Sequence, residues 1–217
     1  MATLVVYADT SDGYVQSQNT NVASMRSGSS LSATTTGGVL QVGQRLTAGL
    51  YIGYLGAVEF DTSSLGSGST VSSVALELNL LENNSLLTTH TQEVYALDWG
   101  GTLQTSHWRT PAQLGGMTLL ASISTSGIGT LNQYKTFAEN GTNFRSAINL
   151  TGMTRLVLQS SRFRNSNTPS ADEYLAWSSA NTVGTTSDPK LTIDWEAAPN
   201  TSIPVFMHHY RQQGIGG

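Results

Sequence analysis

The chain has 217 residues, which suits one domain, or one domain with an extension, and is long enough to bury a sizeable core. Only 11% of its residues are charged, against about a quarter in an average globular domain. With ten Lys and Arg and a formal net charge of −4, it lacks the basic face that phosphate binding needs, which argues against nucleic acid as a partner. The absence of Cys excludes disulfides and Cys-based metal or catalytic sites.

The start of the chain shows no export or membrane signal. Residues 1–3 lead directly into an expected strand, without the basic region and the apolar region of about 7–15 residues that form a signal peptide. No apolar run approaches the ~20 residues of a membrane-spanning helix. We therefore expect no membrane insertion, and the alternative for the missing signal is its removal during cloning.

In chain order, short segments of β-type alternation recur, separated by clusters of Gly, Ser, Thr and Asn. This pattern is typical of an all-β sandwich of about eight to ten strands. Residues 138–149 carry the one helical hint, and Gly141 weakens it to a single turn. We expect strands near residues 3–8, 13–17, 39–43, 50–60, 71–82, 91–98, 117–124, 153–160, 173–178 and 189–195.

Residues 51–80 carry the clearest pattern, because they read as two antiparallel strands joined by a polar loop. Apolar residues alternate along both strands, so one face of each belongs to the core. The loop between them is polar apart from Leu65, which we expect to lie under the sheet. The same alternation occurs on the later strands near residues 153–160 and 189–195. On all of these strands together, the residues that we predict to be buried are Phe60, Leu76, Leu78, Leu156, Leu158 and Ile193.

The same stretch carries a family resemblance. A strand that ends in Phe60-Asp61, followed by Ser63-Ser64-Leu65 and an alternating strand, resembles the DNRLRE-type, carbohydrate-binding-module-like jelly-roll family. This resemblance spans residues 3–195 and implies a jelly-roll-like antiparallel β-sandwich. Further segments that fit the family pattern are 7–9 with 13–15, 94–99, 107–108 and 188–195.

A second resemblance concerns function. The segments 98–100, 155–162 and Glu173-Tyr174 are similar to jelly-roll proteins of bacteriophage virions. This implies a virion structural protein that is assembled in the cytoplasm of a bacterial host and released by lysis. Its partners would be capsid or tail subunits and further copies of itself, and a weakly charged surface suits such an assembly.

The character of the sequence changes after Trp195. We divide the chain into a β-sandwich domain, residues 1–195, and a C-terminal extension, residues 196–217, that acts as an inter-subunit arm. An apolar cluster on an extension is costly to leave in water, so it docks on its own sheet or on a neighbouring subunit. The expected interface residues of the arm are Ile203, Val205, Phe206, Met207 and Tyr210.

Catalytic patterns are absent. Nucleophilic catalysis needs a Ser with a His in reach and an acid behind it, but the four His lie at 90, 107, 208 and 209 and no Gly-x-Ser-x-Gly motif is present. No pair of acids is marked as the two carboxylates of a glycosidase. We therefore expect no enzyme, no catalytic residues and no bound transition metal.

Calcium is the one metal ion whose binding the sequence does not argue against. Asp9, Asp12 and Asp61 lie near strand ends, where a binding sandwich can hold a structural calcium ion with oxygen ligands. The favoured alternative is that these carboxylates cap turns. Beyond calcium, we expect no cofactor.

Sugar binding needs an exposed aromatic ring. Trp108 is the best candidate, because it lies between His107 and Arg109 in a segment without strand alternation, and these three residues are the glycan-contact candidates. Trp177 and Trp195 alternate within strands and are predicted to be core. The favoured function is therefore a non-enzymatic virion structural protein, such as a capsid decoration, cement, tail or fibre component. The alternative is a carbohydrate-binding module or an adhesin for cell-surface glycan.

Overall fold

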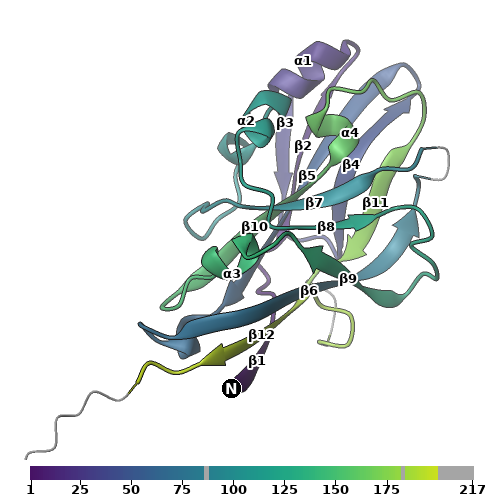
Figure 1. Ribbon diagram of the computed structural model, residues 1–217. Coiled ribbons are helices and arrows are strands. Elements are labelled where there is room, and N and C mark those ends of the chain that lie inside the picture. Colours follow the sequence, from purple (N-terminus) through teal and green to yellow (C-terminus); the bar gives the residue numbers. More distant parts are fainter. Residues whose placement is uncertain (86–87, 182–183, 200–217) are drawn as a thin grey trace, which may run out of the picture.

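The computed structural model describes residues 1–85, 88–181 and 184–199, and its regular secondary structure is mostly antiparallel β-strand, with a few short helices (Figure 1). The strands are β1 (Ala2–Tyr7), β2 (Gly13–Asn19), β3 (Leu31–Thr34), β4 (Val39–Thr47), β5 (Leu50–Asp61), β6 (Thr70–Asn83), β7 (Thr91–Ala96), β8 (Ala121–Ser124), β9 (Gln133–Glu139), β10 (Met153–Ser160), β11 (Glu173–Ser178) and β12 (Lys190–Glu196). The helices are short: α1 (Val22–Ser27), α2 (Pro111–Gly115), α3 (Asn143–Ser146), α4 (Ser161–Arg164) and the 3₁₀ turns η1 (Ser63–Leu65) and η2 (Thr105–His107).

Eight strands close into a barrel in the order β6-β11-β4-β5-β10-β7-β8-β9, because β9 pairs with β6 as well as with β8. Every pairing is antiparallel. The all-β, sandwich-like class expected from the sequence is therefore confirmed, with the layers joined into one closed sheet.

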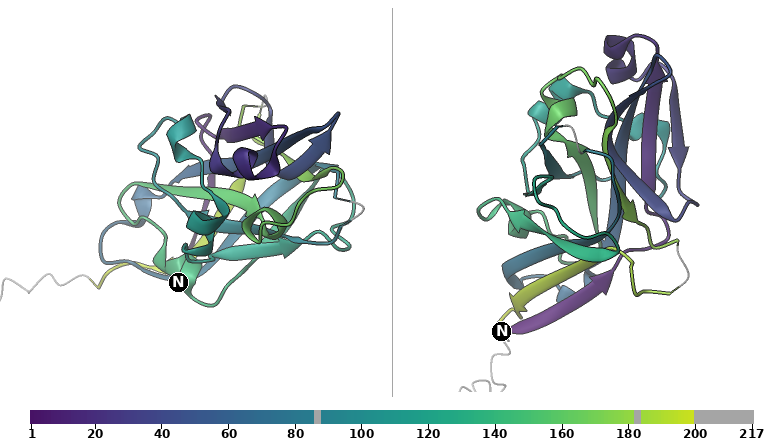
Figure 2. Two further views of the ribbon diagram at one scale, coloured as in Figure 1. Left: turned by 90° about the horizontal axis from the view of Figure 1, so that it is seen from above. Right: turned by 90° about the vertical axis from the view of Figure 1, so that its right-hand side faces the viewer.

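Two pairs of strands extend from this barrel. β12 pairs with β6 and carries β1 on its other side, while β2 pairs with β5 and carries β3. β1 and β12 lie side by side at the lower end of the molecule in both Figure 1 and the right-hand view of Figure 2. β2 and β3 lie at the opposite end, next to α1 and α2 (Figure 1). β1 and β3 are thus the edges of the sheet.

The main core fills the barrel. All six residues predicted to be buried lie in it, each with no exposed surface. Leu65 is also buried there, beneath the η1 turn, as expected. Trp177 packs against Phe137 with ring centroids 5.5 Å apart, which confirms it as a core residue, whereas Trp195 is only partly buried at the margin.

A second apolar cluster lies on the outer face of the same sheet. Leu55 of β5, Val157 of β10 and Tyr95 of β7 pack under Met25 of α1 and Phe163 of α4. β5 is therefore buried on both faces, which is why its sequence reads as a near-continuous apolar run.

The structure has more strands than the eight to ten predicted. β3 and β9 were not expected, because β3 has only four residues and β9 buries only Phe137, so neither shows a clear alternation. β8 begins at Ala121 rather than near 117. The expected single helical turn is present as α3.

Candidate functional site

The strand β1 has an open side. It pairs with β12 from Ala2↔Trp195 to Tyr7↔Lys190, and no other strand of the described residues pairs with it. An edge of this kind presents a row of backbone N–H and C=O groups to which another chain can add a strand. β1 is therefore the strongest candidate for a contact surface.

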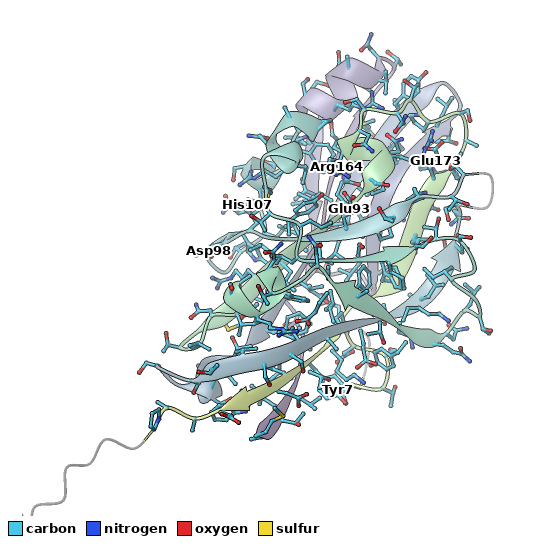
Figure 3. All side chains as sticks on the ribbon, viewed as in Figure 1. Tyr7, Glu93, Asp98, His107, Arg164 and Glu173 are labelled. Carbon is cyan, nitrogen blue, oxygen red and sulfur yellow. The ribbon has the colours of Figure 1, made fainter. Side chains whose placement is uncertain are left out.

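The chemistry of β1 leaves this edge unprotected. Its sequence, ATLVVY, contains no charged residue and no Pro, the usual devices that keep an edge strand from pairing. Val5 is 48% exposed and Tyr7 is 43% exposed. Among the described residues, Tyr7 is the most exposed aromatic residue. Figure 3 shows Tyr7 at the lower end of the molecule, away from Glu93 and Arg164. The opposite edge, β3, is shorter and has no exposed large apolar side chain.

The last strand of the chain, β12, ends near this edge. β12 ends at Glu196, beside the start of β1, where the terminal amine lies 3.9 Å from the Glu196 carboxylate. Ala198 then lies on the β6 side of β12, because a β-carbon added at Gly68 would come within 3.1 Å of the Ala198 β-carbon. The expected interface residues of the arm, Ile203, Val205, Phe206, Met207 and Tyr210, lie outside the described residues.

Trp108 does not provide an exposed ring, so that expectation is wrong. Only 5% of the residue is exposed, and its ring packs edge-on against Phe163 with centroids 5.4 Å apart. Its indole Nε1 donates a hydrogen bond of 3.1 Å to the carbonyl of Arg26. The ring is thus part of the second core cluster, and its partner residues come from distant parts of the sequence, which local alternation cannot reveal.

His107 and Arg109 hold the turn that buries Trp108. The backbone N–H of Gln104 donates to His107 Nδ1 at 2.9 Å, and Arg109 Nη1 donates to the carbonyl of Trp108 at 2.9 Å. The pKa of His107 is lowered by partial burial and by the nearby Arg109 guanidinium. Both side chains are half-buried, and without an accessible indole between them they do not form a stacking platform for sugar.

The three calcium candidates do not come together. Asp61 accepts a hydrogen bond of 3.0 Å from the backbone N–H of Ser63 and so caps the η1 turn. Asp12 is fully buried and accepts from the Ala180 backbone N–H at 2.7 Å and from Asn181 Nδ2 at 2.9 Å. Within residues 1–85, 88–181 and 184–199, no three His, Asp or Glu side chains form a metal-binding group. The turn-capping alternative is therefore confirmed for Asp61, whereas Asp12 accepts its hydrogen bonds from a segment that follows β11.

The environment of Asp12 raises the pKa of its carboxyl group. Burial, with smaller contributions from the neighbouring Asp188 and Asp9 carboxylates, raises its pKa to about 7, although the hydrogen bonds from Ala180 and Asn181 oppose the shift. Asp12 lies in the β1–β2 loop, and its two partners follow β11. Its carboxyl group therefore fastens these two segments together.

A shallow depression of about 400 Å³ opens beside this loop. The residues that line it include Thr10, Ser11, Thr35, Thr102 and Asp9. None of the described residues that line it is aromatic. It offers hydrogen bonds to a polar ligand but no ring on which a pyranose can stack.

Three buried glutamates are each neutralised by an arginine from residues 155–164. Arg155 of β10 and Arg162 and Arg164 of α4 each bind a Glu on a different strand, and all three carboxylates are almost fully buried. Figure 3 shows Glu93 and Arg164 next to each other beneath the α4 turn. The pairs are Arg155 Nε with Glu59 at 2.6 Å, Arg162 Nε with Glu173 at 2.6 Å, and Arg164 Nε with Glu93 at 2.7 Å.

Neighbouring groups complete these pairs. Arg155 also binds Asp98 at 2.7 Å, and the pKa of Asp98 is lowered by the Gly100 backbone N–H and by Arg155. Tyr95 donates to Glu93 at 2.6 Å, and the pKa of Tyr95 is raised by burial and by that carboxylate. A carboxylate held in this way is a structural anion rather than an acid or base aimed at a substrate.

The His90 ring lies against backbone and amide groups. It is buried, its Nδ1 lies 3.1 Å from the carbonyl of Thr88, and its Nε2 lies 3.0 Å from Gln92 Nε2. Burial lowers the pKa of this imidazole. His208 and His209 lie outside the described residues, so of the four His only His90 and His107 have a known setting.

No protein-family model matches this chain, and no curated protein matches it. The resemblance to jelly-roll virion proteins therefore stays a prediction. In addition, the described residues contain no helix long and apolar enough to cross a bilayer.

Sequence reasoning placed β1 correctly but did not recognise it as a contact surface. The available signal was the combination of an alternating first strand with a complete lack of charge. That combination becomes informative only once the strand is known to lie at a sheet edge, which depends on its pairing with β12, nearly 190 residues later in the chain.

Proposed function

We propose that this protein is a non-enzymatic structural component of a bacteriophage particle that acts through protein–protein contacts. In this role it joins capsid or tail subunits, and further copies of itself, during assembly in the cytoplasm of the bacterial host. The observation that carries the proposal is the uncharged, open β1 edge with exposed Val5 and Tyr7. A protein that stays free in solution protects an edge strand of this kind from pairing. An unprotected edge therefore suits a subunit whose edge is covered by a neighbouring protein in the assembly.

The state of the potential catalytic groups favours this role over an enzyme. Glu59, Glu93 and Glu173 are each neutralised by an arginine, and His90 is bound to backbone and amide groups. The weak overall charge favours it over a nucleic-acid binder. The burial of Trp108 removes the ring on which the alternative of glycan binding depended.

Protein analysis of purified phage particles tests the proposal. Particles from a lysate of the bacterium that carries this gene should contain the chain as a stoichiometric component. The Val5→Lys, Tyr7→Lys variant should be incorporated poorly, whereas Leu131→Lys, which alters a residue of the same 43% exposure as Tyr7 outside every strand, should be incorporated normally. Absence of the chain from particles would overturn the proposal, and retention on immobilised glycan would then favour the adhesin.

A further inference from the structure

We propose that the open side of β1 binds residues 205–210 from the C-terminal extension of a second copy of this chain, added as an extra strand. This inference deepens the proposed function, on which it rests, by naming the partner segment. It starts from the described edge: β1 is six residues long, uncharged, and paired on one side only.

The extension has the right length and composition for this edge. Residues 205–210, VFMHHY, match β1 in number and contain no Asp, Glu, Lys or Arg. Val, Phe and Tyr are residues that favour strands. Pro204 comes immediately before them, and Pro is tolerated at the start of an edge strand. Two uncharged strands can pair without placing like charges opposite each other.

Both sides of such a strand find apolar neighbours. In extended geometry, Val205 and Met207 face one way and Phe206 faces the other. β1 offers Val5 and Tyr7 on its exposed face and the partly buried Leu4 and Val6 on the other. An added strand would therefore extend the apolar surface of the sheet on both faces.

The course of the chain favours a second copy over the same molecule. β12 lies between β6 and β1, and Ala198 lies against Gly68, on the β6 side. To reach its own β1, the extension would have to turn back around the end of β12 and cross β1. The 18 residues from 200 to 217 can span up to about 60 Å when extended, which is enough to reach a neighbouring molecule.

Sedimentation of full-length variants, alone and mixed, tests this inference. We expect the parent chain to self-associate between about 1 µM and about 100 µM. The edge variant Val5→Lys, Tyr7→Lys and the arm variant Val205→Lys, Phe206→Lys should each bind at least about tenfold more weakly. An equimolar mixture should regain association, because the intact arm of the edge variant can bind the intact edge of the arm variant. Leu131→Lys should associate like the parent.

Each other outcome overturns the inference. A parent that stays monomeric at all concentrations would mean that the arm binds its own molecule or nothing. An arm variant that associates normally, together with a defective edge variant, would indicate direct pairing of two β1 edges. A mixture that fails to recover would show that the two surfaces do not bind each other. Because particle composition is measured separately, failure here leaves the proposed function testable on its own.

Discussion

Arg164 binds both carboxylate oxygens of Glu93, with Nε to Oε2 and Nη2 to Oε1 distances of 2.7 Å each. Glu93 is only 3% exposed, and the hydroxyl of Tyr95 donates to the same carboxylate at 2.6 Å. The pKa of Arg164 is raised, because its guanidinium donates to Glu93. This pair joins α4 to β7 and lies over the second apolar cluster.

Removing one partner of this pair should be costly. Arg164→Met leaves the Glu93 charge buried without its cation, and we expect a loss of about 3 kcal/mol in the free energy of unfolding, measured by denaturant titration. The double variant Glu93→Gln, Arg164→Met should be more stable than the sum of the two single variants predicts. Strict additivity of the single losses would show that the pair contributes no coupling.

Trp108 should be essential for stability rather than for binding. Trp108→Ala opens a cavity among Phe163 and Met25 and removes the bond to the Arg26 carbonyl, so we expect a loss of about 3–5 kcal/mol. Trp195→Ala should cost less, because Trp195 is only partly buried. Equal thermal unfolding temperatures for Trp108→Ala and the parent would contradict the core position of this ring.

The contact of Gly13 with β3 predicts a steric effect. A β-carbon at Gly13 would lie 2.0 Å from the carbonyl oxygen of Thr34, within the β2–β3 pairing, so Gly13→Ala should cost about 1–3 kcal/mol or more. Gly115→Ala is the matched control, because a β-carbon there meets nothing within 4 Å and Gly115 is helical. Gly115→Ala should be neutral or slightly stabilising. Similar losses for both variants would rule out this steric explanation.

Asp12 should make the protein less stable as the pH rises from about 4 to about 7. Its pKa in the folded chain is about 7, against an ordinary value of 3.8, so in this window the folded state holds a proton that the unfolded state has released. This group alone should then lower the free energy of unfolding by up to about 1.4 kcal/mol per pH unit, with the loss complete above pH 7.

The comparison with Asp12→Asn isolates that effect. The variant cannot titrate at this position, so its stability should vary less steeply between pH 4 and pH 7 than that of the parent. Asp61→Asn should keep the slope of the parent, because Asp61 is exposed and its pKa is lowered by Ser63. Identical slopes for Asp12→Asn and the parent would show that Asp12 is not the responsible group.

Sequence patterns predicted the fold class well, because the barrel strands alternate in a way that residues such as Phe60, Leu76 and Ile193 make visible. They failed for Trp108, because a core on the outer face of the sheet is assembled from turns and short helices that have no period. They also missed the Arg–Glu pairs, since Arg164 and Glu93 are 71 residues apart and only the barrel topology brings them together. The open edge of β1 likewise follows from strand order, which alternation does not encode.

Amide hydrogen exchange of β1, in the isolated chain and in the purified particle, tests most directly whether this edge is the assembly contact. An outward-facing N–H group of an unpaired edge exchanges rapidly, and it becomes protected when another strand accepts its hydrogen bond. We predict that the outward-facing N–H groups within residues 2–7 become strongly protected on assembly, while residues 31–34 of the other edge strand, β3, exchange as they do in the free chain. Unchanged exchange in β1 within particles that contain the protein would contradict this account.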